Sequence, residues 1–347
     1  MQPNRKPPAV DAHPAGSVRQ QRPTRPAGLQ GVPVADLAAE LLHRLLAAAA
    51  PSALGEADVR LGLLLARELE TRLDVHQNRT SRTRYRDLFE NFHRSLAPER
   101  PPLDGATWVD LGCGAVSPWG ALFLFIALGA RRGIAIDPDV VQDAAESSRA
   151  LADLAALLLV DPSGVVADHP IERAQLLRNL EGFDLARLRA GDPAGLAAGR
   201  LDHRRESVHA LSLGDGEADV VMTNAFLEHI DRVDAALAEL ARITRRGGFG
   251  IHVVDGRDHR SIEERSFHPL EFLREPAGDG LRHGCNRLRP LEFARAFERH
   301  GFRVVQAVAF ERIAIDAATV ASFAEPFRSL PQEVLAVTQA KLVVRRN

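Results

Sequence analysis

Asp110-Leu111-Gly112-Cys113-Gly114 closes a short apolar run, Thr107 to Leu111, and this stretch decides the fold. A second apolar run, Gly133 to Ile136, ends at Asp137, twenty-three residues after Gly114. Glycines let the backbone turn sharply and approach a ligand closely, and an acid after the next strand can bind two ribose hydroxyls. The order strand, glycine turn, helix, strand and acid therefore predicts a βαβ unit that binds a phosphate or adenosine group.

The residues after the turn separate two classes of ligand. A dinucleotide site has a third glycine where this chain has Ser117, and it places a pyrophosphate at the helix N-terminus. Ser117 and Pro118 instead predict an N-cap and a first helical residue. Asp110 adds a carboxylate before the glycines, which suits a cationic ligand better than a pyrophosphate. The following helix is expected to pack on a sheet through an apolar stripe of Trp119, Leu122, Phe123, Ile126 and Ala127.

This turn resembles the first motif of the class I S-adenosylmethionine-dependent methyltransferases, which has an acid two residues before Gly-x-Gly. The later segments Leu201–Leu213 and Val220–Thr223 are similar to the family's third and fourth strands, and a segment ending in Leu-Glu-His follows them at 224–230. In this family a helix and a Gly-Gly pair typically come before the fifth strand. This chain has the same order, with Gly247-Gly248 before a strand from Phe249 to Val254.

The resemblance implies an α/β fold, a seven-stranded doubly wound Rossmann-like methyltransferase sheet with an N-terminal helical extension and helical insertions. Phe302 to about Phe310 is expected to be a strand. In this fold the final strand, here Leu335 to Val344, runs antiparallel between the fifth and sixth strands. Ligands are expected outside the carboxyl ends of the strands.

The resemblance also implies the cofactor S-adenosyl-L-methionine, which leaves as S-adenosyl-L-homocysteine. The family's adenine-binding acid falls on Ser207, with Glu206 beside it, and a serine hydroxyl accepts a weaker hydrogen bond than a carboxylate. Adenine recognition is therefore expected to depend more on the Val208 amide and on apolar walls. The expected cofactor-binding residues are Asp110, Gly112, Cys113, Gly114, Asp137, Pro138, Ser207, Val208 and Asn224.

Three segments beyond the fifth strand, 252–259, 267–273 and 286–290, bear on the acceptor. They resemble a bacterial methyltransferase subgroup associated with glycan, cell-surface polysaccharide and secondary-metabolite gene neighbourhoods. Gly256 departs from that subgroup's usual leucine. The resemblance covers about Tyr85 to Val344, and its motifs are specific for fold and cofactor but not for substrate. It favours O-methylation of a small molecule or glycan, with N- or C-methylation of a natural product as an alternative.

A hydroxyl acceptor has to lose a proton, and His259 is the first candidate for the base because it follows the fifth strand. Asp255 and Asp258 complete the expected catalytic set by raising its basicity, and histidines titrate near neutral pH. As an alternative, Asp258 and His259 cap or pin the loop. His252, inside a strand, is expected to be a packed core histidine.

The expected substrate-binding residues are His229, Arg287 and Arg289. The arginines suit an acidic group on the acceptor, such as a uronate or phosphate, through bidentate hydrogen bonds. They could equally cap the loop through backbone carbonyls. His229 follows Glu228 at a helix start, where such a pair more often orders the loop near the methionine group than moves protons.

Composition narrows the class of protein. The chain has 347 residues, 45% of them hydrophobic, and a net charge of −2, so no global field attracts nucleic acid or anionic lipid. We expect no nucleic acid or membrane partner, since no apolar stretch is long enough to span a bilayer. With two cysteines and no His/Cys/Asp cluster at metal-ligand spacing, we expect a reduced, cytoplasmic protein without a metal.

Three regions are expected along the chain. Residues 1–31 are rich in Pro, Arg, Gln and Ala and predict a disordered tail. Residues 32–100 predict an N-terminal helical region that acts as a lid, packs on the domain or forms a homodimer contact. Residues 101–347 form the methyltransferase domain, with insertions at about 150–200 and 255–289, and the first insertion is expected to add helices at the sheet edge.

Two other classes of function use the same βαβ unit. A nicotinamide-dependent oxidoreductase is disfavoured by Ser117, Asp110 and the Glu228-His229 segment. A degenerate member of the fold that binds a partner without catalysis has Ser207 as its main support. Calorimetric binding of S-adenosylhomocysteine followed by a turnover assay would separate these two classes from a methyltransferase.

Overall fold

The computed structural model describes residues 87–94, 99–160, 162, 165–166, 169, 171–264, 266–278 and 280–347. All of them belong to one unit of the chain, Val34–Asn347. The expected tail, 1–31, and most of the expected helical region, 32–100, lie outside the described residues and stay predictions.

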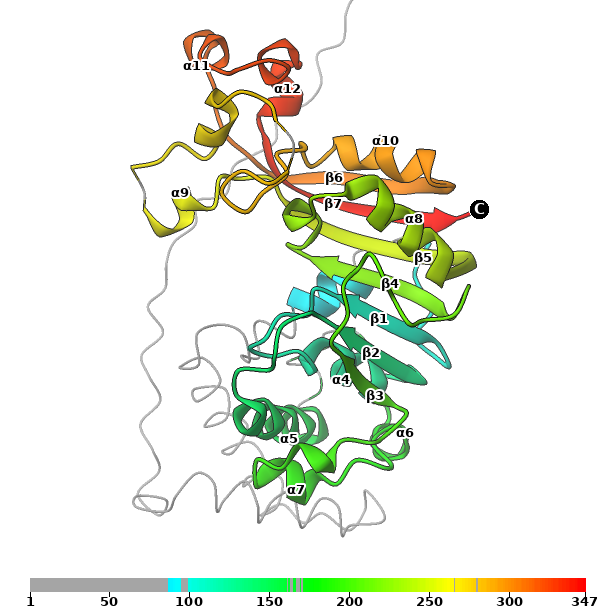
Figure 1. The fold of residues 1–347 in the computed structure, drawn as a ribbon. Helices are drawn as coiled ribbons and strands as arrows, with labels where there is room; N and C mark the ends of the chain where they lie inside the picture. Colours follow the sequence, from blue (N-terminus) through cyan, green and yellow to red (C-terminus); the bar gives the residue numbers. More distant parts are fainter. Residues whose placement is uncertain are drawn as a thin grey trace, which may run out of the picture. The chain divides into compact units, whose positions relative to one another are not determined.

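One seven-stranded sheet organises the described chain, in the order β3-β2-β1-β4-β5-β7-β6 (Figure 1). Its strands are β1 (Thr107–Leu111), β2 (Arg132–Ile136), β3 (Leu201–Arg204), β4 (Ala218–Asn224), β5 (Thr244–Asp255), β6 (Phe302–Arg312) and β7 (Val337–Arg346). The pairs β1–β2, β1–β4, β2–β3 and β4–β5 are parallel, whereas β7 is antiparallel to β5 and β6. This is the doubly wound topology expected from the sequence, including the antiparallel last strand.

The central strands are apolar because helices cover both faces of the sheet. Strands β1, β2 and β4 are almost entirely buried, as is typical of a covered parallel sheet. The helical elements are η3 (Glu90–Arg94), α4 (Gly120–Ala127), α5 (Ala144–Val160), α6 (Arg173–Asn179), α7 (Leu185–Arg189), η5 (Pro193–Gly195), η6 (Leu227–His229), α8 (Val233–Ile243), α9 (Arg260–Glu263), η7 (Glu271–Arg274), α10 (Glu292–Arg299), α11 (Ala317–Ala321), η8 (Phe327–Ser329) and α12 (Gln332–Leu335).

Two apolar cores lie on opposite faces of this sheet. Helices α4 to α7 contribute to one core, and α8 and α10 contribute to the other (Figure 1). A third cluster joins η7 to the segment before β7, through residues such as Phe272, Phe323 and Leu335. Leu88, Phe89 and Phe92 belong to the first core, so the described part of the 32–100 region packs as a buried segment.

The first helix after the glycine turn begins later than the sequence predicts. Helix α4 starts at Gly120, and its N-cap position is Trp119, which makes no side-chain cap bond. The prediction of Ser117 as N-cap and Pro118 as first helical residue is wrong, because both lie in the turn before the helix. The predicted apolar stripe is too narrow as well: every residue of α4 is buried, since α5 and η3 share its core.

The segment at 150–200 contains most of α5 and all of α6, α7 and η5. Leu176, Leu185 and Leu188 bury their side chains in the core of α4 and α5. Asn179 Nδ2 donates a 2.9 Å hydrogen bond to the Ala127 carbonyl oxygen at the end of α4. The extra helices therefore pack on that face of the sheet. Within the described part of the chain, no helix is long and apolar enough to cross a membrane.

Candidate functional site

The glycine turn follows β1, the strand at which the strand order of the sheet reverses. β2 pairs with one side of β1 and β4 with the other. Gly112 and Gly114 have φ values of +72° and +75°, a region that side chains disfavour. The Gly112 amide donates a 2.8 Å hydrogen bond to the Ile136 carbonyl oxygen. A Cβ atom on Gly112 would lie 2.2 Å from the Phe226 ring. Glycine is thus required at 112 by both the backbone and a side chain.

Asp137 fixes the turn to the end of β2. Its carboxylate accepts hydrogen bonds from the Gly114 amide at 3.0 Å and from the Asp139 amide at 2.9 Å. Burial raises the pKa of the Cys113 thiol far above its usual range, and the carboxylates of Asp110 and Asp137 raise it further. The electrostatic potential at the turn is therefore negative, which favours binding of a cation over binding of an anion.

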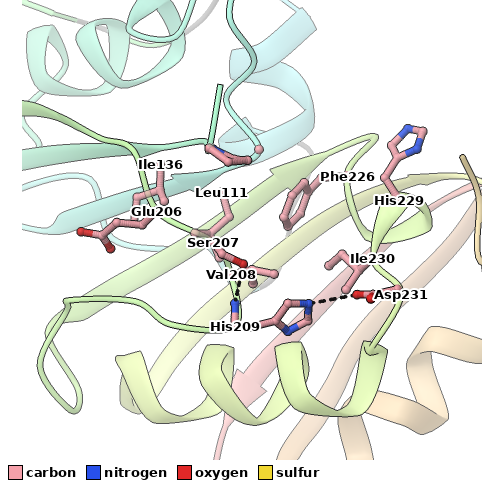
Figure 2. Close-up of a pocket in the computed structure, with 12 residues that line it drawn as sticks. Leu111, Ile136, Glu206, Ser207, Val208, His209, Phe226, His229, Ile230 and Asp231 are labelled. Carbon is pink, nitrogen blue, oxygen red and sulfur yellow. Dashed lines mark hydrogen bonds and ion pairs between the residues drawn. The ribbon is translucent and has the colours of Figure 1, made fainter. Parts of the chain in front are cut away.

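A cavity of about 220 Å³ lies beside this turn (Figure 2). Its lining residues are Leu111, Gly112, Ile136, Pro138, Glu206, Ser207, Val208, His209, Phe226, His229, Ile230 and Asp231. Of the expected cofactor residues, Gly112, Pro138, Ser207 and Val208 line the cavity. Asp110, Cys113, Gly114 and Asp137 belong to the adjoining turns, and Asn224 ends β4.

The cavity walls are mostly apolar, and most polar side chains in them have hydrogen-bond partners, although His209 Nδ1 has none among the described residues. Figure 2 shows Ser207 and Phe226 around the same space, with the Glu206 carboxylate turned away. That carboxylate accepts hydrogen bonds from the amide and hydroxyl of Ser212. Ser207 Oγ accepts one from the His209 amide at 3.3 Å. Glu206 therefore does not replace the missing adenine-binding acid in this conformation.

The cavity is smaller than the roughly 300–1,000 Å³ of typical sites for drug-sized ligands. It accommodates one end of such a ligand. The glycine turn contributes Leu111 and Gly112 to one side of the cavity, and apolar residues such as Val208 and Phe226 form other walls.

A second group of polar residues lies beyond the cavity, where η6 meets the loop after β5. His229 lines the cavity, and its ring centroid lies 4.8 Å from that of His259. His229 Nδ1 is 2.8 Å from the Gly284 carbonyl oxygen. Because a carbonyl only accepts, Nδ1 carries the proton and Nε2 is left with the lone pair. His229 therefore connects the cavity to the 255–289 segment.

Glu228 is buried between these elements, with 1% of its surface exposed. Its Oε1 atom accepts a 3.1 Å hydrogen bond from the Asp255 amide, whereas Oε2 has no hydrogen-bond partner in the described structure. Burial raises the pKa of Glu228 to about 8. This carboxyl is an uncompensated polar group beside the paired histidines.

Asp255 and Asp258 have other partners than His259. Asp255 binds the Arg257 guanidinium and accepts a 2.9 Å bond from Gln339 Nε2. Asp258 is fully buried and accepts bonds from the Arg260 guanidinium and the Phe272 amide. Burial alone would raise the pKa of both carboxyls. The hydrogen bonds from the neighbouring arginine outweigh burial, so the pKa of each carboxyl lies below its usual value.

His259 is half-buried at the N-terminus of α9, and its Nε2 atom has no hydrogen-bond partner among the described residues. Burial lowers its pKa, and His229 lowers it further. Asp255 and Asp258 do raise the pKa of His259, as expected, but burial has the larger effect and the net shift is downward. Asp258 anchors the loop, as the sequence alternative proposed.

Arg287 and Arg289 are buried and hold backbone carbonyls. The Arg287 guanidinium donates to the carbonyl oxygens of Phe272, Glu275 and Pro276 at 2.9–3.2 Å. Arg289 donates to Gly256 at 2.6 Å and to Val337 at 2.7 Å. The loop-capping alternative thus describes both contacts. The expected substrate-binding role of the two arginines stays a prediction, which these contacts do not support.

Several residues of the site were not singled out from the sequence. Phe226 and Ile230 form cavity walls, and Asn286 Nδ2 binds the carbonyls of Leu227 and Ile230. Cys285, 2% exposed, lies against the two histidines. Phe226 adjoins the Leu-Glu-His segment, which could have indicated it. Cys285 has no such signal, because its neighbours are distant in sequence.

The methyltransferase-domain family matches residues 80–307, about two thirds of the chain. No curated protein matches. A solved S-adenosylmethionine-dependent methyltransferase from Mesorhizobium loti is 15% identical, with a TM-score of 0.38, over 73% of this chain and 95% of its own.

Two further solved structures give similar values. Geranyl diphosphate methyltransferase in complex with S-adenosylmethionine is 14% identical, with a TM-score of 0.42, over 80% of this chain and 90% of its own. The [4+2]-cyclase SpnF is 15% identical, with a TM-score of 0.39, over 90% and 93% of the two chains. Similarities this low say nothing of activity. The family match, on the expected sheet topology, shows that the chain belongs to the methyltransferase-domain family, whose cofactor is S-adenosyl-L-methionine.

Proposed function

We propose that the protein transfers a methyl group from S-adenosyl-L-methionine to an oxygen atom of a small molecule or glycan. The observation that carries this proposal is the position of His229. This residue lines the cavity beside the glycine turn and also contacts His259 on the loop after β5. A donor site and a pair of imidazoles that can handle a proton are therefore neighbours.

The donor side consists of the glycine turn, Asp137–Asp139 and the cavity. We assign the adenosine group to the cavity, with the Asp137 carboxylate at the ribose and the apolar walls against adenine. The carboxylates of Asp110 and Asp137 favour a positively charged sulfonium nearby. Since Ser207 is already bonded to the His209 amide, adenine binding depends on shape and on backbone groups more than on an acidic side chain.

The acceptor side consists of η6 and residues 255–289. S-adenosylmethionine supplies a methyl group that its sulfonium has already activated, so the chain mainly has to position the acceptor and exclude water. A hydroxyl acceptor also loses a proton, and we assign its removal to His259. The lowered pKa of His259 keeps the imidazole neutral at pH 7, which is the form that accepts a proton.

The acceptor class follows from the same contacts and from the resemblance to enzymes of glycan and secondary-metabolite clusters. Arg287 and Arg289 are committed to backbone carbonyls, which weakens the case for an acidic acceptor. A neutral sugar or phenolic hydroxyl suits the site better. N- or C-methylation of a natural product is the alternative, and so is binding without catalysis.

Calorimetric titration with S-adenosylhomocysteine tests the donor side. We expect micromolar binding, and no heat in that range would contradict the proposal. A methyl-transfer screen over sugars, phenols and amines then identifies the acceptor atom. Turnover of amines alone would favour the alternative reaction, and binding without turnover would favour the non-catalytic reading.

His259→Ala tests the acceptor side. It should leave S-adenosylhomocysteine affinity unchanged and slow transfer to a hydroxyl by about 10²- to 10⁴-fold, the usual contribution of a positioned base. His283→Gln is the matched control, because His283 is an exposed histidine on the same segment that binds Glu275. Unchanged turnover in His259→Ala would remove the proposed role.

A further inference from the structure

Three side chains of metal-ligand type meet on the acceptor side: His229, His259 and Cys285. Their potential ligand atoms all lie within 4.8 Å of one another. They come from three separate segments, thirty and twenty-six positions apart, which is why the spacing in the sequence gives no sign of a metal site. We expect no metal from the sequence because of this spacing and because the chain has only two cysteines.

We propose that His229, His259 and Cys285 bind one zinc ion at the acceptor side, with a fourth coordination position left for the acceptor oxygen. Two imidazoles and one thiolate form a donor set that zinc favours. Three protein ligands and one open position are the usual arrangement of a catalytic zinc site, whereas structural sites have four protein ligands.

The distances need only a small adjustment. Zinc bonds of about 2.0–2.1 Å to nitrogen and 2.3 Å to sulfur place tetrahedral ligand atoms about 3.5 Å apart. The three groups would therefore approach one another by about 1 Å from their present separation. His229 has an exposed side chain, so it can move with little cost in packing.

The hydrogen bonds of the histidines agree with this assignment. His229 Nδ1 donates to the Gly284 carbonyl oxygen, which leaves Nε2 as the metal-binding atom. A ligand histidine usually donates its other N–H group to a carbonyl or carboxylate in this way. His259 Nε2 is buried and has no hydrogen-bond partner in the described residues, so a bond to zinc would satisfy it.

A buried carboxyl gives a second, independent indication. Glu228 is 1% exposed, and its Oε2 atom has no hydrogen-bond partner in the described structure. Glu228 adjoins His229 in the sequence, so this unsatisfied carboxyl lies next to a proposed ligand. A cation held by the three ligands would supply a positive charge near this carboxyl and displace the Cys285 thiol proton to solvent.

The metal site itself goes beyond the proposed function. The role of zinc in binding the acceptor hydroxyl, however, rests on that proposed function. With zinc bound, His259 is a ligand and not the base. A hydroxyl oxygen in the fourth position then loses its proton to solvent at a lower pH than in water. The oxygen lone pair forms the bond to the methyl carbon as the carbon–sulfur bond breaks, and the electron pair of that bond stays on sulfur as a neutral thioether.

The test uses the full chain, stripped with a chelator and titrated with Zn²⁺ alone. We expect one zinc per chain by elemental analysis, and a thiolate-to-metal absorption band when Co²⁺ is used as the probe. Cys285→Ser should abolish this band and weaken Zn²⁺ binding at least about 100-fold. His229→Gln is the second variant should Cys285→Ser fail to fold, and His283→Gln, an exposed histidine of the same segment, should bind Zn²⁺ normally.

Binding of S-adenosylhomocysteine, measured on the same samples, reports on the donor side and on folding. No stoichiometric zinc, or zinc retained in Cys285→Ser, overturns the metal site whatever the donor binding. Zinc bound without donor binding contradicts the methyltransferase proposal instead. Methyl transfer that is unaffected by the chelator shows that His259 acts without a metal and overturns the role of zinc.

Discussion

The donor side and the acceptor side differ in how far apart in sequence their contacts are. The turn of the donor side is built from one βαβ unit, in which Gly112, Gly114 and Asp137 lie within 26 residues of one another, and residues 206–231 add walls of the cavity. The acceptor side depends on contacts between 228 and 255, 229 and 284, and 289 and 337. Local motifs thus form the first, and long-range burial forms the second.

This difference predicts that substitutions on the two sides fail in different ways. On the acceptor side, removing a long-range contact should mainly lower the free energy of unfolding. On the donor side, a change in the turn should mainly lower affinity for the cofactor. The following predictions test this contrast.

Arg289→Leu should have the largest effect. The guanidinium is fully buried and bonds the carbonyls of Gly256 and Val337, so its loss leaves two buried acceptors without donors. At about 1–3 kcal/mol for each unsatisfied group, we expect the free energy of unfolding to fall by about 4 kcal/mol. Urea denaturation measures this change.

Arg303→Leu is the matched control for Arg289→Leu. Arg303 forms an exposed ion pair with Glu99, and such pairs contribute at most about 1 kcal/mol. The folded fraction of Arg289→Leu should still bind S-adenosylhomocysteine with nearly wild-type affinity. Equal stability losses in the two arginine variants would remove the contrast between long-range and surface contacts.

Gly112→Ala should have the next largest effect, and on affinity. The new Cβ atom would meet the Phe226 ring at 2.2 Å, so this cavity wall has to move. We expect S-adenosylhomocysteine to bind about 10- to 100-fold more weakly in calorimetry. Gly199→Ala has the same positive φ penalty with no atom within 4 Å, and it lies outside the cavity lining. It should keep wild-type affinity, and a similar loss there would contradict the steric explanation.

At pH 7 His252→Phe should have the smallest effect, the loss of one buried hydrogen bond with Thr223, and its larger effect is on the pH dependence of stability. His252 is fully buried on β5 and stacks on Phe297, and burial lowers its pKa from 6.5 to about 3. The unfolded chain therefore binds the proton first, so stability is lost as the pH falls below about 6.5. Wild type should lose about 1.4 kcal/mol more per pH unit than the variant between pH 6 and 4.

Urea midpoints measured at pH 7, 6, 5 and 4 give these two curves. The wild-type curve should fall more steeply toward acid pH, because the variant has no imidazole to protonate. Parallel curves would show that His252 does not carry the acid sensitivity. The sequence prediction that His252 is a packed core histidine is confirmed by its burial.

The donor side could be predicted from the sequence because its signals are local. An apolar run that ends in an acid and two glycines specifies a strand and a turn within a few residues, and β1 has the predicted bounds. The exact start of α4 could not be predicted, since Ser117 and Pro118 also suit a turn. In the folded chain both residues lie in the turn before the helix and not in its first turn.

The acceptor side could be predicted only in outline. An arginine is normally exposed, so the sequence favoured a ligand for Arg287 and Arg289 as much as a structural role. Their burial depends on carbonyls of other segments. The lowering of the His259 pKa by burial could not be predicted for the same reason, because desolvation depends on packing. Cys285 could not be connected with His229 and His259 before the fold placed them together.

The position of β7 has a consequence for how the protein is made. β6 pairs with β7 alone in the described sheet, and β7 is the last strand of the chain. A ribosome has to synthesise the residues of β7 before β6 gains a neighbour and before Val337 reaches Arg289. The strands of the donor side have all their partners long before that point. During synthesis, then, the nascent chain should be able to hold the methyl donor before it can hold an acceptor.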